Sequence, residues 1–209
     1  PIYTANRQVR DTLRLIYEPL IDLDENNKLE PVLATDWTEK DDLTWIIKLR
    51  ENVRGHSDKS FGPEDVIFTI NAIKAETTST YYPNVSNIAD VTSIDENSIA
   101  ITLSEKDGLL PYKLNFPIIP NYYYRDDLYN KTKFERPIGT GPYKYVDTTN
   151  DEIRITLDFN TNWWKYSDAK LRKIYLADEV ILNGYSHHLK FVIILYTFQL
   201  LTCVYYIIN

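Results

Sequence analysis

The sequence predicts a mixed α+β fold, in which short helices alternate with strands. Residues 44–49 and 99–103 alternate apolar with other side chains, as half-buried strands do. Residues 63–74 place apolar side chains at helical spacing, and residues 153–159 alternate again. With 209 residues, of which 44% are hydrophobic and 13% aromatic, the chain can bury about 70% of its unfolded surface. We therefore expect a folded protein of one large domain or two small ones.

The first elements expected are a short helix and a hairpin. Residues 12–20 carry apolar side chains at helical spacing, and Pro19 helps to end this helix. Two apolar stretches, 20–23 and 29–33, flank the polar run 24–28, where asparagine accepts positive φ. This pattern predicts a turn or hairpin.

The same polar run begins like a calcium loop. Asp22, Asp24 and Asn26 occupy its first, third and fifth positions. Position six is Asn27 in place of glycine, and position twelve is Leu33 in place of the bidentate glutamate. These departures make a hairpin turn the preferred interpretation.

Residues 36–50 are predicted to form a strand rich in β-branched and aromatic side chains. After a loop at Gly55, Pro63 with Glu64 and Asp65 predicts a helix start, because proline suits the first turn and carboxylates favour the helix dipole. The burial expected for these elements covers Trp37, Trp45, Leu49, Val66, Phe68 and Ile70.

The second half of the chain is predicted to be richer in strands. Residues 91–103 form a strand pair with a turn at 95–97, and residues 111–124, with three prolines and three consecutive tyrosines, are expected as loop and short extended structure. Residues 137–146 contain Gly-Thr-Gly-Pro-Tyr and precede the strand at 153–159.

The end of the chain differs in composition from the rest. The run that begins at Phe191 and ends at Ile208 contains no charged residue. It meets the minimum length of a membrane span, and it equally suits a buried or aggregation-prone strand. Both interpretations stay open here.

Charge and cysteine content exclude several classes of protein. A net charge of -7 disfavours nucleic acid and anionic membranes as partners, because these need clustered cations. The single cysteine, Cys203, excludes an internal disulfide and a cysteine-based zinc site. The chain contains no methionine and begins at Pro1, so we expect that the original start, with any signal peptide, lies outside it.

No catalytic, metal or cofactor set is visible. His56, His187 and His188 are expected to be solvated loop histidines, since adjacent histidines cannot act as an i, i+4 metal pair. Glu64 and Asp65 point about 100° apart on a helix, which favours capping over acid–base chemistry. Gly139-Thr140-Gly141 lacks the third glycine and the acidic residue of a dinucleotide site.

Aromatic side chains are abundant, with 17 tyrosines and 4 tryptophans. Tyrosine offers a rigid apolar face with a hydroxyl, which suits peptide or sugar contacts in a cleft. For each single tyrosine, ordinary packing in the core or on the surface is the preferred interpretation.

Several separated segments resemble the extracytoplasmic solute-binding proteins of peptide-type ABC transporters, the oligopeptide-, dipeptide- and nickel-binding family. The matching segments are IYEPLI at 16–21, LEPVLATDW at 29–37, LTW at 43–45 with LR at 49–50, EDVIF at 64–68, GTGPY at 139–143, and Asn160 with Trp163, Trp164, Leu171 and Ile174. The loop at 55–59 departs from the family pattern, and Pro63 replaces its usual alanine.

The resemblance implies a periplasmic-binding-protein-like fold of type II, here reduced to lobe I with lobe II missing. Residues 1–44 and 136–180 would form the discontinuous sheet domain of this lobe. Residues 45–135 would form an inserted smaller α+β domain, and residues 181–209 an apolar tail outside the resemblance. Such a chain is expected to be a fragment or a truncated or frame-disrupted gene product.

The function implied is non-enzymatic capture of a peptide ligand for the permease subunits of an ABC importer, outside the bacterial cytoplasm, without cofactor or metal. Membrane contact would come from a lipid anchor outside this chain or from the tail between Phe191 and Ile208. Tyr3, Thr4 and Tyr82 are expected at the ligand cleft, because the family's loops at these places border the peptide. Two alternatives remain: a hydrolase of peptides or sugars using Glu64 or Asp65, and a membrane-tethered interaction module.

Overall fold

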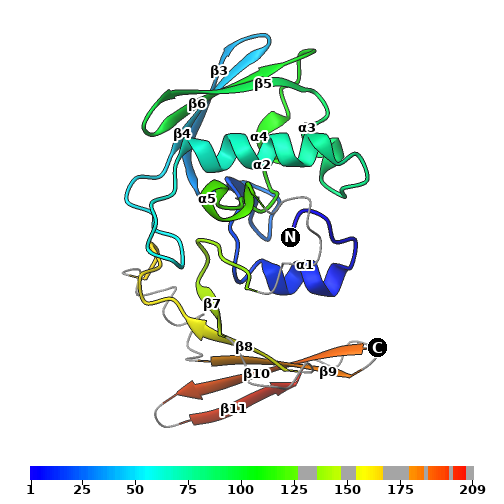
Figure 1. The fold of residues 1–209 in the computed structure, drawn as a ribbon, viewed down its shortest axis with the longest axis vertical. Coiled ribbons are helices and arrows are strands. Elements are labelled where there is room, and N and C mark those ends of the chain that lie inside the picture. Colours follow the sequence, from blue (N-terminus) through cyan, green and yellow to red (C-terminus); the bar gives the residue numbers. More distant parts are fainter. Residues whose placement is uncertain (127–135, 147–153, 167–178, 186–187, 198–199, 206–209) are drawn as a thin grey trace.

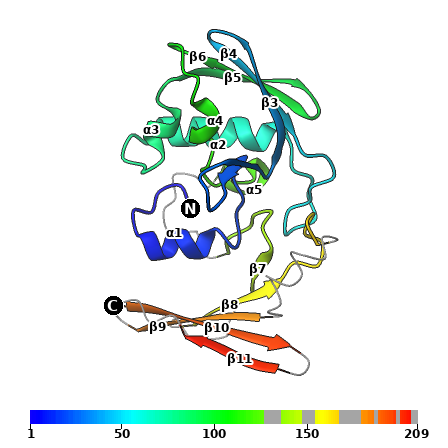
Figure 2. The same cartoon turned by 180° about the vertical axis from the view of Figure 1, so that it is seen from behind.

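The computed structural model describes residues 1–126, 136–146, 154–166, 179–185, 188–197 and 200–205. A four-stranded sheet lies at one end of the molecule, with the long helix α2 (Pro63–Ala75) beneath it (Figure 1). The N-terminal segment and helix α1 (Arg7–Leu13) lie in the middle, and a second sheet closes the opposite end, as the reverse view also shows (Figure 2). The mixed α+β class is confirmed.

The four-stranded sheet is antiparallel throughout. Its strands β3 (Ala34–Asp41), β4 (Thr44–Leu49), β6 (Ser98–Leu103) and β5 (Ile88–Asp95) follow in that order. Trp45 lies opposite Ile101 and Ile47 opposite Ile99, and all four side chains are buried. Helix α2 buries Val66, Ile70 and Ile73 and contacts β5, so its apolar stripe covers the sheet.

The strand expected over residues 36–50 is in fact a hairpin, so that prediction was wrong in its extent. The chain turns at Asp42–Leu43, where Asp41 Oδ1 accepts a hydrogen bond of 3.0 Å from the Leu43 backbone N–H. This aspartate cap replaces the glycine or asparagine that usually marks such turns. The strand pair β5–β6 is confirmed, and the predicted domain boundary after Thr44 falls inside β4.

The helix expected over residues 12–20 was also misplaced. Helix α1 begins after Asn6, whose Oδ1 accepts a bond from the Val9 N–H, and it ends at Leu13. The carbonyls of Leu15 and Ile16 accept hydrogen bonds from Tyr143 and Gly141, at 3.0 and 2.9 Å. These long-range bonds take the acceptors that a longer helix would have used.

The hairpin predicted around residues 24–28 is present as β1 (Ile21–Leu23) and β2 (Leu29–Pro31). Asp24 Oδ1 accepts bonds from the backbone N–H groups of Asn26 and Lys28, each at 2.8 Å, and Asn27 has a φ of 59°. The carboxylate that resembled a calcium ligand thus organises the turn.

Three short helices connect the larger elements: α3 (Tyr82–Val85), α4 (Leu110–Lys113) and α5 (Asn121–Tyr124). The last two lie at the ends of the stretch expected as loop and short extended structure, so two short helices were missed there, whereas a long regular element is absent from residues 111–124 as expected. Proline lies in the first turn of α4 and immediately before α5, where its missing N–H removes no helical bond.

The second sheet is also antiparallel and runs in the order β11-β10-β9-β8-β7. Its strands are β7 (Tyr143–Val146), β8 (Arg154–Phe159), β9 (Glu179–Tyr185), β10 (His188–Thr197) and β11 (Leu200–Tyr205). The apolar tail therefore contributes strands, and within the described ranges no helix has the length and apolar character of a membrane span. Leu171, Ile174 and His187 lie outside the described residues.

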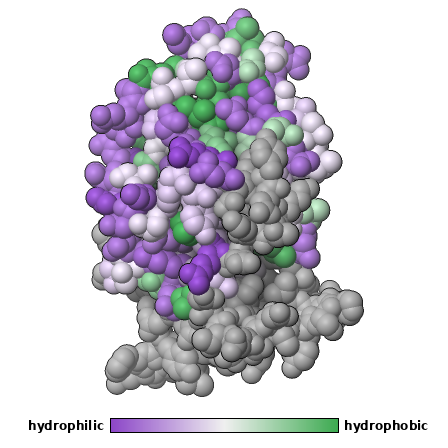
Figure 3. Space-filling model, viewed as in Figure 1, coloured by the Kyte–Doolittle hydropathy of each residue, from purple (hydrophilic) through white to green (hydrophobic). Residues whose placement is uncertain are grey.

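Most of the predicted core is confirmed. Trp45, Leu49, Val66 and Ile70 are buried, whereas Trp37 and Phe68 are half-buried and pack against the core from its margin. The surface seen in Figure 3 is mainly hydrophilic, with an apolar patch where the four-stranded sheet meets α2.

Candidate functional site

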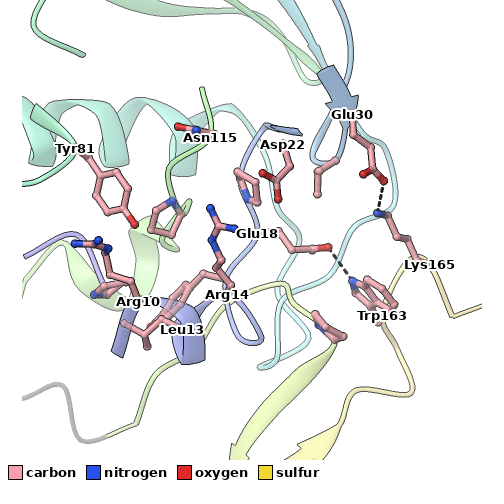
Figure 4. A pocket seen from close by; sticks show the side chains of 16 residues that line it. Arg10, Leu13, Arg14, Glu18, Asp22, Glu30, Tyr81, Asn115, Trp163 and Lys165 are labelled. Carbon is pink, nitrogen blue, oxygen red and sulfur yellow. Dashed lines mark hydrogen bonds and ion pairs between the residues drawn. The ribbon is translucent and has the colours of Figure 1, made fainter. Parts of the chain in front are cut away.

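A pocket of about 250 Å³ opens beside α1, in the middle of the molecule (Figure 4). Its wall combines Arg10 and Leu13 of α1, both strands of the β1–β2 hairpin, and Tyr81 just before α3. Between α1 and β1, the lining residues are Arg14, Tyr17, Glu18 and Pro19. Trp163 and Lys165 close one end. Charged groups of both signs thus face one cavity.

The buried carboxylate of Glu18 forms the polar centre of the closed end. Its Oε1 accepts a 2.9 Å hydrogen bond from Trp163 Nε1, and its Oε2 accepts one of 3.0 Å from Trp164 Nε1. Burial raises the pKa of Glu18, while the two indole donors and the charge of Lys165 act to lower it. This carboxylate anchors the tryptophan pair and is not free for a ligand.

Cations cover the outer faces of the same tryptophan pair. The Arg50 guanidinium lies 3.8 Å from the centroid of the Trp164 ring, and its Nε donates a 2.7 Å bond to the Val32 carbonyl. Lys165 lies 5.0 Å from the Trp164 centroid and 3.6 Å from Glu30 Oε1. The end of the pocket is therefore held by residues from four separate parts of the chain.

The Gly-Thr-Gly segment supports the pocket through its backbone. A Cβ at Gly139 would overlap the carbonyl oxygen of Ile16, and one at Gly141 would lie 2.6 Å from the Leu15 oxygen. Glycine is required here because two backbones meet closely. The motif therefore fixes the segment that leads into Glu18 and needs no phosphate to explain it.

His56 clamps this glycine segment and is not the solvated loop histidine that was expected. Its Nδ1 accepts a 3.3 Å bond from the Gly139 N–H, and its Nε2 lies 2.9 Å from the Gly141 carbonyl. Accepting at Nδ1 while donating from Nε2 requires the neutral ring. Burial lowers the pKa of His56 to about 4, in agreement with that state.

The acidic pair at the start of α2 is accounted for by capping. Asp65 Oδ2 accepts a 3.0 Å bond from the Gly62 N–H, and Oδ1 accepts one of 2.8 Å from the Asn121 N–H. Burial raises the pKa of Asp65, and these two backbone donors act to lower it. Glu64 is exposed, so the two carboxylates do not face a common substrate position.

The structure brings together the two segments predicted to border the ligand, but it does not place their named residues in the pocket. Ser79 Oγ donates a 2.6 Å bond to the Ile2 carbonyl, which ties the N-terminal segment to the loop before α3. Tyr3, Thr4 and Tyr82 are half-buried and do not line the pocket. Tyr81, next to the predicted Tyr82, does line it.

Arg14 and Asp22 also line the pocket and were not predicted as site residues. The signal for Asp22 was present as the supposed calcium ligand, and Arg14 lies inside the expected helix. Their roles in the pocket become visible only in the structure, because α1 ends at Leu13 and the following segment approaches the hairpin.

Comparison with known proteins places this fold in a family. Residues 28–178 match the bacterial extracellular solute-binding proteins, family 5, middle region. Among curated relatives, the di/tripeptide-binding protein 1 of Pseudomonas aeruginosa is 30% identical over 175 residues, and heme-binding protein A of Haemophilus influenzae is 29% identical over 178. Each alignment covers 72% of this chain and 32% of the relative.

A solved structure agrees. NikZ from Campylobacter jejuni, determined in complex with Ni(L-His), matches with a TM-score of 0.71 and 28% identity over 83% of this chain and 34% of its own. This chain thus spans about a third of the length of these proteins. The match is with the periplasmic-binding-protein fold of type II, of which it covers a part. The chain belongs to the bacterial extracellular solute-binding proteins of family 5.

Proposed function

We propose that this chain is the first lobe of a solute-binding protein that captures short peptides outside the cytoplasm and delivers them to the permease of an ABC importer. The observation that carries the proposal is the pocket, whose wall presents arginines and carboxylates together. A short peptide is zwitterionic, so it needs contacts of both signs. Family membership supports capture without chemistry, and the capping role of Asp65 disfavours the hydrolase alternative.

The proposed position of the ligand follows from the expected domains. Residues 1–44 with 136–180 form the sheet domain and residues 45–135 form the insertion, with the β3–β4 hairpin crossing the boundary between them. The ligand lies along the surface shared by the N-terminal segment and the loop before α3. Tyr3, Thr4 and Tyr82 contact the solute from this surface. The 2.6 Å bond from Ser79 to the Ile2 carbonyl supports the proposal, because it holds these two segments together.

The isolated chain should bind weakly. A two-lobe protein buries most of its ligand, and one lobe leaves half of the ligand's hydrogen bonds and apolar contacts unmade. Losing half of a micromolar binding energy of about -8 kcal/mol leaves about -4 kcal/mol, which is a millimolar constant. We expect tighter binding only when the remaining part of a full-length relative is supplied.

Titration of the ¹⁵N-labelled 209-residue chain with trialanine, free heme and the Ni(L-His) complex tests the function. We expect chemical-shift changes that give a millimolar dissociation constant for trialanine, and weaker binding in Tyr82→Ala. Tyr122→Ala is the control, because Tyr122 is 40% exposed and bonds to Ser57 outside the pocket. Saturable binding of heme or the nickel complex alone would replace peptide as the ligand, and a micromolar constant for trialanine would contradict the single-lobe argument.

A further inference from the structure

The pocket separates its free charges onto two walls. Figure 4 shows Arg14 pointing into the cavity, with the Tyr81 hydroxyl directed toward the two arginines on one side and Asp22 on the other. Glu18, Glu30 and Lys165 of the wall are engaged with other residues. Glu18 bonds to both indoles, and Glu30 lies 3.6 Å from Lys165 Nζ.

Among the basic side chains of this wall that the structure describes, Arg14 is the one available to a ligand. Arg10 already donates a 3.0 Å bond from Nη1 to the Ala5 carbonyl. In the part of the chain that the structure describes, the Arg14 guanidinium makes no hydrogen bond or ion pair, and the Tyr81 hydroxyl makes no hydrogen bond. Both groups therefore have donors directed at the cavity that no described residue accepts.

The opposite wall has a complementary group. Asp22 Oδ1 accepts a 2.9 Å bond from the Leu23 N–H, and its second oxygen has no partner among the described residues. A guanidinium binds a carboxylate through two parallel hydrogen bonds, and a phenolic hydroxyl adds a third donor. A carboxylate at Asp22 favours an ammonium group.

The size of the pocket limits what it holds. A complete small-molecule site occupies roughly 300–1,000 Å³, and this pocket has about 250 Å³. It therefore suits a small zwitterionic solute or the charged part of a larger one.

We propose that Arg14 and Tyr81 bind a carboxylate of the captured solute, with Asp22 contacting a cationic group across the pocket, so that this lobe selects carboxylate-bearing ligands. The inference rests on the proposed function and adds a chemical class to it. The carboxylate belongs to the C-terminus of a peptide or to an acidic side chain.

Three peptides distinguish these sources: trialanine, trialanine amide, and the amide of Ala-Glu-Ala. Each is titrated into the ¹⁵N-labelled chain, with the Trp163 indole N–H as reporter because this side chain lines the pocket. We expect trialanine to bind at least about tenfold more tightly than its amide, which is the loss of one hydrogen-bonded charge. Binding of Ala-Glu-Ala amide at the strength of trialanine assigns the site to acidic side chains, and failure of this peptide assigns it to the C-terminus.

Arg14→Gln should weaken the carboxylate-bearing peptide about tenfold and leave trialanine amide unchanged. Arg14→Lys, which keeps the charge without the planar fork, should fall between the two. Arg14 is exposed, so folding is not at risk, and Arg7→Gln is the matched control because exposed Arg7 lies 3.8 Å from Asp11 outside the pocket. A peptide affinity that changes neither on amidation nor in Arg14→Gln would overturn this inference and leave the proposed function intact. Absence of any peptide binding to the parent chain would overturn both.

Discussion

Glu18 and Trp163 lie 145 positions apart in the chain, and a 2.9 Å hydrogen bond from the indole Nε1 joins them. The second indole, of Trp164, bonds to the same carboxylate. A buried carboxylate that accepts from two indoles is costly to remove, because both donors would be left unsatisfied. The pair thus connects the segment before β1 to the turn after β8 and holds the closed end of the pocket.

Glu18→Ala should lower the free energy of unfolding by about 2–4 kcal/mol, because it leaves two indole N–H groups without an acceptor. Glu18→Gln keeps one acceptor and should cost less. Urea denaturation followed by tryptophan fluorescence measures both. Exposed Glu25 is the control, and Glu25→Ala should stay within about 0.5 kcal/mol of the parent. Equal stabilities of the Glu18→Ala and Glu25→Ala variants would contradict an anchoring role.

The glycine segment gives a second stability prediction. Gly139→Ala should cost about 3 kcal/mol or more, because the new Cβ would overlap the Ile16 carbonyl and force two backbones apart. Gly108→Ala is the matched control, since a Cβ there meets no atom within 4 Å. Thermal unfolding of both variants decides between close backbone packing and an unconstrained loop, for which the two substitutions would have similar effects.

The lowered pKa of His56 predicts that the stability of the fold depends on pH. Its folded pKa of about 4 lies below the ordinary value of 6.5, so between these values the unfolded chain binds more protons than the folded one. The stabilising contribution is complete above pH 6.5 and is lost as the pH falls toward 4, amounting to about 3 kcal/mol. His56→Gln can still accept and donate but does not titrate in this range.

The measurement is the difference in unfolding free energy between the parent and His56→Gln, at pH 7.5 and at pH 4.5. Taking this difference cancels the contribution of carboxyl groups such as Glu18 and Asp65, which titrate in both proteins. We expect the parent to lose stability relative to the variant on acidification. A difference that is independent of pH would show that His56 is protonated equally in the folded and unfolded chains.

Local patterns predicted the elements whose bonds are local. Helix α2 begins at Pro63, as the proline and the following carboxylates indicated, and the β5–β6 pair follows its alternation. The first helix was predicted too far along the chain, because the carbonyls of Leu15 and Ile16 accept hydrogen bonds from a segment more than a hundred residues away. Periodicity carries no information about such a partner.

The candidate site was harder to predict for the same reason. The motif containing Glu18 was recognised as a family feature, yet its role depends on two tryptophans from the distant turn. Of the neighbouring tyrosines at the start of α3, Tyr82 was predicted as the site residue, whereas Tyr81 is the one that lines the pocket. Arg14 carried no local signal, because its significance comes from the absence of a partner within hydrogen-bonding distance in the described structure.

The acidic pair at the start of α2 gives the last prediction, which separates a structural role from a catalytic one. Asp65→Ala should lower the free energy of unfolding by about 1–3 kcal/mol, because its carboxylate accepts from the backbone N–H groups of Gly62 and Asn121. Asp65→Asn keeps one acceptor oxygen and should cost less, and exposed Glu64→Ala should change stability by less than about 0.5 kcal/mol. Urea melts of the three variants measure these differences, and a chromogenic peptide substrate incubated with the parent chain provides the second readout. Turnover that disappears in Asp65→Asn without a matching loss of stability would overturn the capping interpretation and restore the hydrolase alternative.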